Sequence, residues 1–74
     1  MTLHDLQVGQ MGKIRKIRTT GPLKQRFMDM GITQGIPVTV IKIAPLGDPV
    51  EIEIRGYNLS IRKDDAEKIE IEEV

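Results

Sequence analysis

Three observations in the sequence predict a mainly β fold. Five short segments carry strand-like patterns of apolar and polar residues, one amphipathic segment follows the first of them, and a helical turn precedes the last. An OB-fold would place its main helix after the third strand, whereas here the helix follows the first. That order predicts a small five-stranded SH3-like barrel, formed as a single domain by residues 1–74.

The first segments combine a helical turn with an irregular strand. Thr2 and Asp5 are spaced as a capping box, which predicts one turn of helix. The segment Met11–Thr19 favours a strand because it contains two isoleucines and ends in two threonines. Its apolar residues are three apart instead of two, so we expect a β-bulge that brings Ile14 and Ile17 to one face.

The segment Gly21–Gly35 contains the one clear amphipathic helix. Pro22 suits the first helical position, and Gly31 suits the left-handed residue that ends a helix. Ile32 is placed to fold back as the apolar partner of a Schellman cap. We expect the apolar face to cover the open side of the sheet. The residues of this face are Leu23, Phe27 and Met30.

The second half of the chain predicts four more strands. Ile36–Ile43 has apolar residues on both faces, so we expect it to twist or bulge and to be covered on both sides. Ala44–Pro49 is a loop, because two prolines surround Gly-Asp. Strict alternation predicts a hairpin after the loop, and Ala66 points inward from the helical turn that follows. These later elements are Val50–Arg55, 57–62, the turn Lys63–Lys68 and Ile69–Glu72.

Composition excludes several kinds of chemistry. The chain has 74 residues, no cysteine, one histidine and a formal net charge of zero. No thiolate is available, and His4 has no partner set by sequence, so we predict no enzyme, no catalytic residue and no cofactor. Glu51 and Glu53 share a strand face that could touch a hard cation, but a solvated face is the favoured reading. We therefore predict no metal site.

Nucleic-acid binding is the first alternative function. Four cations, Lys13, Arg15, Lys16 and Arg18, lie in one predicted strand and could follow a phosphate backbone. Stacking residues are nearly absent, however, because Tyr57 stands alone and the single phenylalanine is needed in the core. The same charges would also keep an edge strand from aggregating. We do not expect a nucleic-acid partner.

Protein docking is the favoured class. We predict that Lys24 and Arg26 supply charge from the outer face of the helix, and that Leu46 and Asp48 contribute from the loop. Three of these four residues have a structural alternative. Leu46 could fold back as a plug, Asp48 could bond the backbone of its own turn, and Arg26 could pair with Asp29.

Several motifs resemble the FeoA family, and the likeness spans nearly the whole chain. They are Gln25-Arg26, Asp29-Met30-Gly31, Gly35, the loop Ala44–Pro49, Arg55-Gly56-Tyr57 and Leu59–Arg62. The resemblance implies an SH3-like barrel that is a cytoplasmic accessory protein of bacterial ferrous iron uptake. The implied partner is the cytosolic GTP-binding part of the membrane transporter FeoB.

A similar domain ends some metal-dependent transcriptional repressors, which leaves a regulatory domain as a further alternative. The chain shows no DNA-binding domain before the barrel, so we expect the stand-alone role. We also expect no membrane insertion, since no stretch approaches the roughly 20 apolar residues of a span. The charges of the Met11–Thr19 segment argue against edge pairing between copies, so we expect a monomer.

Overall fold

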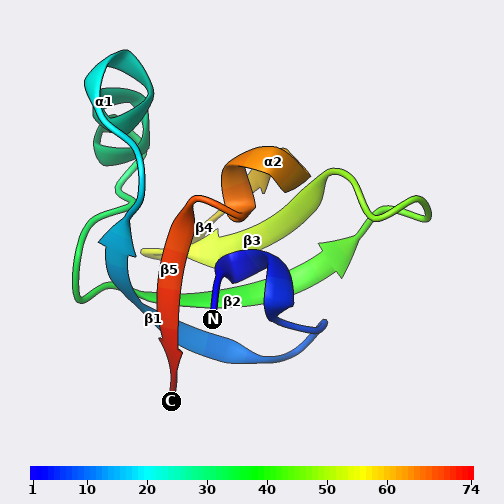
Figure 1. The fold of residues 1–74 in the computed structure, drawn as a ribbon. Coiled ribbons are helices and arrows are strands. Elements are labelled where there is room, and N and C mark those ends of the chain that lie inside the picture. The colour runs from blue at the N-terminus through cyan, green and yellow to red at the C-terminus, as the bar shows by residue number, and fades with distance from the viewer.

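The computed structural model describes all 74 residues and contains one antiparallel sheet of five strands in the order β4-β3-β2-β1-β5 (Figure 1). The strands are β1 (Met11–Ile17), β2 (Pro37–Ile43), β3 (Val50–Ile54), β4 (Tyr57–Ile61) and β5 (Ile69–Glu73). The helices are the 3-10 turn η1 (Leu3–Asp5), α1 (Gly21–Asp29) and α2 (Lys63–Ala66). The predicted order is confirmed, with the main helix after the first strand and a helical turn before the last.

The sheet is curled, and β1 lies between β2 and β5 in it (Figure 1). Its first residues pair with β2, and it pairs with β5 from Gly12 to Ile17. The curl encloses a single core of 14 buried apolar side chains. Leu3, Leu6 and Ala66 belong to this core, so η1 and α2 close the open side of the sheet. Asp5 accepts a hydrogen bond from the Thr2 N–H at 2.8 Å, as the capping-box spacing predicts.

Both irregular strands contain bulges, as the apolar spacing predicts. The register of β1 against β5 shifts between Ile14 and Lys16, which leaves Ile14 buried and Ile17 half-buried. The register of β2 against β3 shifts between Val40 and Lys42. The expectation that this second strand is covered on both sides is wrong, because Ile41 remains 39% exposed.

The expected position of α1 is also wrong. The helix does not lie across the open side of the sheet but stands beyond the end of β1 (Figure 1). Its apolar face is as predicted: Phe27 is 1% exposed, and Leu23 and Met30 are half-buried against the core. The helix begins at Gly21, so Pro22 is its second residue and not its first. Helical periodicity identifies the buried face but not the place where that face packs.

The C-terminal end of α1 forms the predicted Schellman cap. Gly31 has φ +90°, its N–H bonds the Met28 carbonyl at 3.0 Å, and the Ile32 N–H bonds the Phe27 carbonyl at 2.9 Å. The Tyr57 hydroxyl, at the start of β4, donates a further hydrogen bond to the Met30 carbonyl. The hairpin between β3 and β4 therefore holds the end of the helix against the barrel.

Candidate protein-docking site

The loop between β2 and β3 projects from one end of the molecule (Figure 1). The Gly47 N–H bonds the Ala44 carbonyl at 2.7 Å, and the Ala44 N–H bonds the Pro49 carbonyl at 3.1 Å. Leu46, at the tip, is 94% exposed and does not fold back as a plug. The loop is therefore a closed turn that presents one large apolar side chain to solvent.

Asp48 ties this loop to α2. Its Oδ1 accepts a hydrogen bond of 2.9 Å from the backbone N–H of Lys63, the first residue of that helix. The expectation that Asp48 bonds the backbone of its own turn is therefore wrong. The first N–H groups of a helix have no partner within the helix, so a carboxylate from elsewhere in the chain stabilises them. Asp48 positions the loop that carries Leu46.

The two predicted cations of α1 do not share one face. Residues two apart in a helix are separated by about 200° around its axis, so Lys24 and Arg26 point to different sides. Arg26 is exposed and makes no ion pair with Asp29. The carboxylate of Asp29 instead accepts a 2.9 Å hydrogen bond from the Gln25 side chain. The Arg26–Asp29 pair, which was the structural alternative to docking, is not formed.

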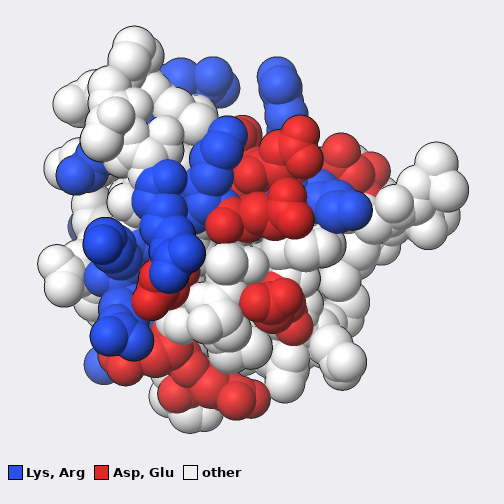
Figure 2. All heavy atoms as spheres, viewed as in Figure 1, with Lys and Arg blue, Asp and Glu red and all other residues white.

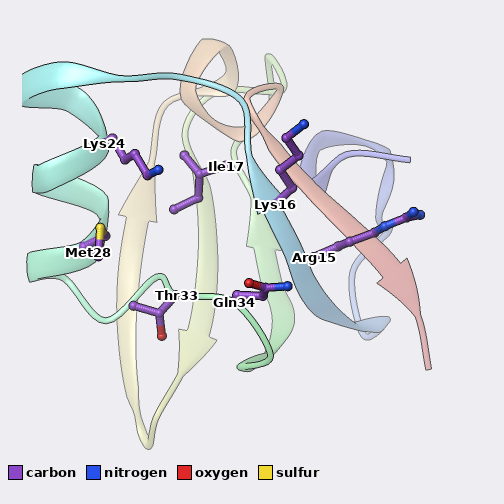
Figure 3. Close-up of a pocket in the computed structure, with 7 residues that line it drawn as sticks. All are labelled: Arg15, Lys16, Ile17, Lys24, Met28, Thr33 and Gln34. Atoms are coloured by element: carbon purple, nitrogen blue, oxygen red, sulfur yellow. The ribbon is translucent and has the colours of Figure 1, made fainter.

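Lys24 lines a groove between α1 and β1, which the sequence did not predict. The groove has a volume of about 470 Å³. Figure 3 shows Lys24 extending from the helix toward Ile17 of β1, while Lys16 extends from the other side of the strand. Lys24 and Met28 are four residues apart, so they lie on one side of α1. The seven lining residues are Arg15, Lys16, Ile17, Lys24, Met28, Thr33 and Gln34, and none is acidic.

One carboxylate interrupts the basic surface beside this groove. Glu70 on β5 accepts a 2.6 Å hydrogen bond from Arg18 Nε, and Arg15 Nη1 lies 3.8 Å from its other oxygen. The hydrogen bond from Arg18, helped by the charges of Arg18 and Arg15, holds the pKa of Glu70 below its usual 4.5. Figure 2 shows a group of cations over the side of α1 and β1, while other cations stand apart from it, one of them among acidic residues on the side of the projecting loop.

The four predicted docking residues therefore fall at two separate ends. Leu46 and Asp48 belong to the β2–β3 loop, and Lys24 and Arg26 belong to α1 at the opposite end (Figure 1). The molecule extends 30 Å along its longest axis. A partner could contact all four residues only by reaching across the whole domain.

Chemistry other than docking gains no support from the side-chain arrangement. No group of three or more His, Cys, Asp or Glu residues is placed to hold a metal ion. Glu51, one of the two outward glutamates, accepts a 3.2 Å hydrogen bond from Asn58 on the neighbouring strand. None of the helices is both long and apolar enough to cross a membrane.

Comparison with known sequences identifies relatives over the full length of the chain. The family model described as the FeoA domain matches residues 1–73. A protein of Porphyromonas gingivalis strain W83, the "Fe(2+) transport protein A/Fe(2+) transporter FeoB fusion protein", is 40% identical over 72 residues. The match covers 97% of this chain and 8% of the fusion protein, so the chain spans a small part of that relative.

Comparison with solved structures confirms the fold. The iron(II) transport protein A of Clostridium thermocellum has a TM-score of 0.97 and 34% identity, over 100% of this chain and 46% of that one. The FeoA of Stenotrophomonas maltophilia, solved with zinc and described as a procaryotic SH3 domain protein, has a TM-score of 0.85 and 17% identity. That match covers 97% of this chain and 89% of the other, and it shows the fold alone. The SH3-like fold is therefore confirmed, and the chain belongs to the FeoA domain family.

Proposed function

We propose that this chain is an accessory protein of ferrous iron uptake that acts in the cytoplasm by docking to the cytosolic GTP-binding part of a FeoB-type transporter. Support comes from family membership and from the fusion protein of P. gingivalis, in which a related domain and a FeoB transporter form one chain. Fusion keeps two domains at a high effective concentration, which is of use when they act on each other.

The exposed position of Leu46 is the observation that carries the docking mechanism. Leu46 is 94% exposed, so it lowers the solubility of the chain and does not contribute to the hydrophobic core. The turn beneath it is already closed by two backbone hydrogen bonds and by the bond from Lys63 to Asp48. A partner would therefore bury this side chain without first ordering the loop, so little conformational entropy would be lost on binding.

The cations of α1 would form a second contact region at the other end. Arg26 is exposed and has no ion-pair partner, so it is available to a carboxylate of a partner protein. Such a peripheral charge contributes more to the association rate than to the affinity. Leu46 is therefore the main predicted contact, and Arg26 is a weaker one.

Two contacts also favour docking over nucleic-acid binding. Arg18 is held by Glu70, and the hydroxyl of Tyr57 is engaged with the Met30 carbonyl. Arg18 is therefore not a free cation, and the one exposed aromatic side chain of the molecule already holds the end of α1. Nonspecific binding of single strands relies on several stacking residues and many free cations.

The test is a titration of the purified cytosolic domain of a FeoB-type transporter, with GDP and with a GTP analogue. We expect Leu46→Ala to weaken binding by about fivefold or more, the equivalent of about 1 kcal/mol for a truncated contact at an interface centre. Val8→Ala is the matched control, because Val8 is also exposed, at 58%, but lies in a different turn. Equal affinity of the two variants and the wild type would contradict the proposed contact.

A further inference from the structure

The groove between α1 and β1 combines positive charge with an apolar floor. Lys16 and Lys24 stand on its two sides and take part in no ion pair. Ile17 and Met28 supply the apolar surface of the groove. Met28 is 45% exposed, so its apolar side chain is accessible to a ligand. No carboxylate lines the groove. The bulge in β1 leaves the adjacent residues Arg15 and Lys16 both exposed, where regular alternation would turn one of them inward.

The edge of β1 that borders this groove has no strand partner. β1 pairs with β2 only from Met11 to Lys13, and Ile14 then bonds the chain at Gly35 and Ile36. From Arg15 to Ile17 the strand has β5 on one side and no strand on the other. An unpaired strand edge offers N–H and C=O groups to an incoming extended chain.

These features restrict the chemistry of an occupant. Its charge must be negative, because every ionisable residue that lines the groove is a cation. A compact phosphate group would favour an arginine fork or converging backbone N–H groups, whereas the two free cations here are lysines on separate elements. An RNA or DNA strand would need aromatic platforms, and none lines the groove. Carboxylates spread along an extended, partly apolar peptide satisfy all three constraints.

We propose that this groove binds an extended acidic segment of a partner protein, which lies along the free edge of β1. Its carboxylates meet Lys16 and Lys24, and an apolar side chain between them packs on Ile17 and Met28. The inference does not depend on the proposed docking through Leu46, since the groove and the loop lie at opposite ends of the molecule (Figure 1). The two sites can therefore be tested, and can fail, separately.

The test uses the whole chain labelled with ¹⁵N and a short synthetic peptide of alternating Glu and Leu residues. We expect saturable amide shifts confined to residues 15–17, 24, 28 and 33–34. The double substitution Lys16→Gln/Lys24→Gln should weaken peptide binding at least tenfold. The control, Lys42→Gln/Lys63→Gln, removes the same charge from lysines that also have no ion pair, and it should bind like the wild type.

Four results of the peptide titrations would overturn the proposal. The first two are the absence of saturable amide shifts and equal shifts at all lysines. The third is an equal loss of peptide affinity in both double variants. The fourth is that a peptide of alternating Lys and Leu binds as tightly as the Glu and Leu peptide. Tighter binding of an oligouridylate or of inorganic phosphate at the same amides would also overturn it, by showing that the groove selects phosphate and not carboxylate. Retained amide dispersion in both double variants would show that a loss of binding does not come from unfolding.

Discussion

The two ends of this small barrel are built in different ways. Each is tied to the barrel by one hydrogen bond between a side chain and a distant backbone group. Asp48 binds the Lys63 N–H at the loop end, and Tyr57 binds the Met30 carbonyl at the α1 end. The α1 end also places Phe27 in the core, whereas Leu46 at the loop end contacts solvent. Under the proposed docking, stability and recognition would therefore be coupled at the α1 end and separate at the loop end.

Charge divides the ends in the same way. The tip of the projecting loop is uncharged in Figure 2, and cations gather over α1 and β1. A 74-residue domain has a small core and can devote few residues to a binding site alone. If the proposed contacts form, an apolar contact and a charged contact at opposite ends would each act without disturbing the other. The following substitutions break or sharpen that contrast.

Phe27→Ala should have the largest effect, because Phe27 is the largest fully buried side chain and the main anchor of α1. Truncating a buried phenylalanine costs about 3–5 kcal/mol. At about 0.05–0.15 kcal/mol per residue, a domain of this size has a total free energy of unfolding of roughly 4–11 kcal/mol. The variant should therefore be partly or wholly unfolded. Urea denaturation measures the loss.

Two further variants, Phe27→Leu and Leu46→Ala, are the controls for Phe27→Ala. Phe27→Leu should remain folded with a loss of about 1.5 kcal/mol or less, because most of the apolar volume is kept. Leu46→Ala, at the other end, should change the free energy of unfolding by less than about 0.5 kcal/mol. An equal loss in Phe27→Ala and Leu46→Ala would remove the contrast between the two ends.

Gly31→Ala tests the clamp on the end of α1. Gly31 has φ +90°, and an added Cβ would lie 3.1 Å from the Arg55 side chain and 3.1 Å from the Tyr57 hydroxyl oxygen. Gly35→Ala is the matched control, since Gly35 has φ +87° and open space around it. In both variants the free energy of unfolding should fall by about 1–2 kcal/mol, because alanine disfavours the left-handed backbone conformation. Gly31→Ala should lose about 1 kcal/mol more from crowding, and equal losses would show that the hairpin does not hold the helix.

Asp48→Ala tests the tie at the loop end. Removing an acceptor from the first N–H of a helix costs about 0.5–2 kcal/mol, so the unfolding midpoint in urea should fall modestly. Asp48→Asn keeps an acceptor oxygen and should recover most of the loss. An Asp48→Ala midpoint equal to that of the wild type would show that this hydrogen bond does not stabilise the loop.

Glu70→Gln should have the smallest effect, a slight destabilisation near neutral pH that disappears in acid. The lowered pKa of Glu70 means that its charged form is favoured in the folded chain. Its stabilising contribution is complete above the unfolded pKa, near 4.5, and is lost as the pH falls through the folded pKa. The thermal midpoint of the variant should therefore decline less steeply below pH 4.5. Glu67→Gln, an exposed control, should follow the wild type, and parallel curves for Glu70→Gln and wild type would contradict the account.

Local patterns in the sequence predict local structure well in this chain. The bulge in β1, the apolar face of α1 and the glycine that ends the helix all depend on residues within seven positions of one another, and all are present. The place where α1 packs depends instead on how far the sheet curls. Two short elements, η1 and α2, already fill the open side with Leu3, Leu6 and Ala66, so α1 is left at one end.

The candidate site shows the same limit. Exposure of Leu46 was one of two readings, because a loop sequence does not reveal whether its tip folds inward. The Asp48–Lys63 bond spans 15 residues and leaves no local pattern. The spacing of Lys24 and Arg26 did carry a usable signal, since residues two positions apart do not share a helix face. The groove beside Lys24 could not be predicted, because it depends on the position of α1.

The most direct test of docking through the loop is to map amide signals of the ¹⁵N-labelled chain as the cytosolic domain of a FeoB-type transporter is added. We predict that the signals of Leu46, Gly47 and Asp48 shift or broaden at the lowest concentrations of partner. Leu46→Ala should move this response to partner concentrations about fivefold higher or more, while its thermal midpoint stays that of the wild type. A partner that binds and leaves these three amides unchanged would contradict the account.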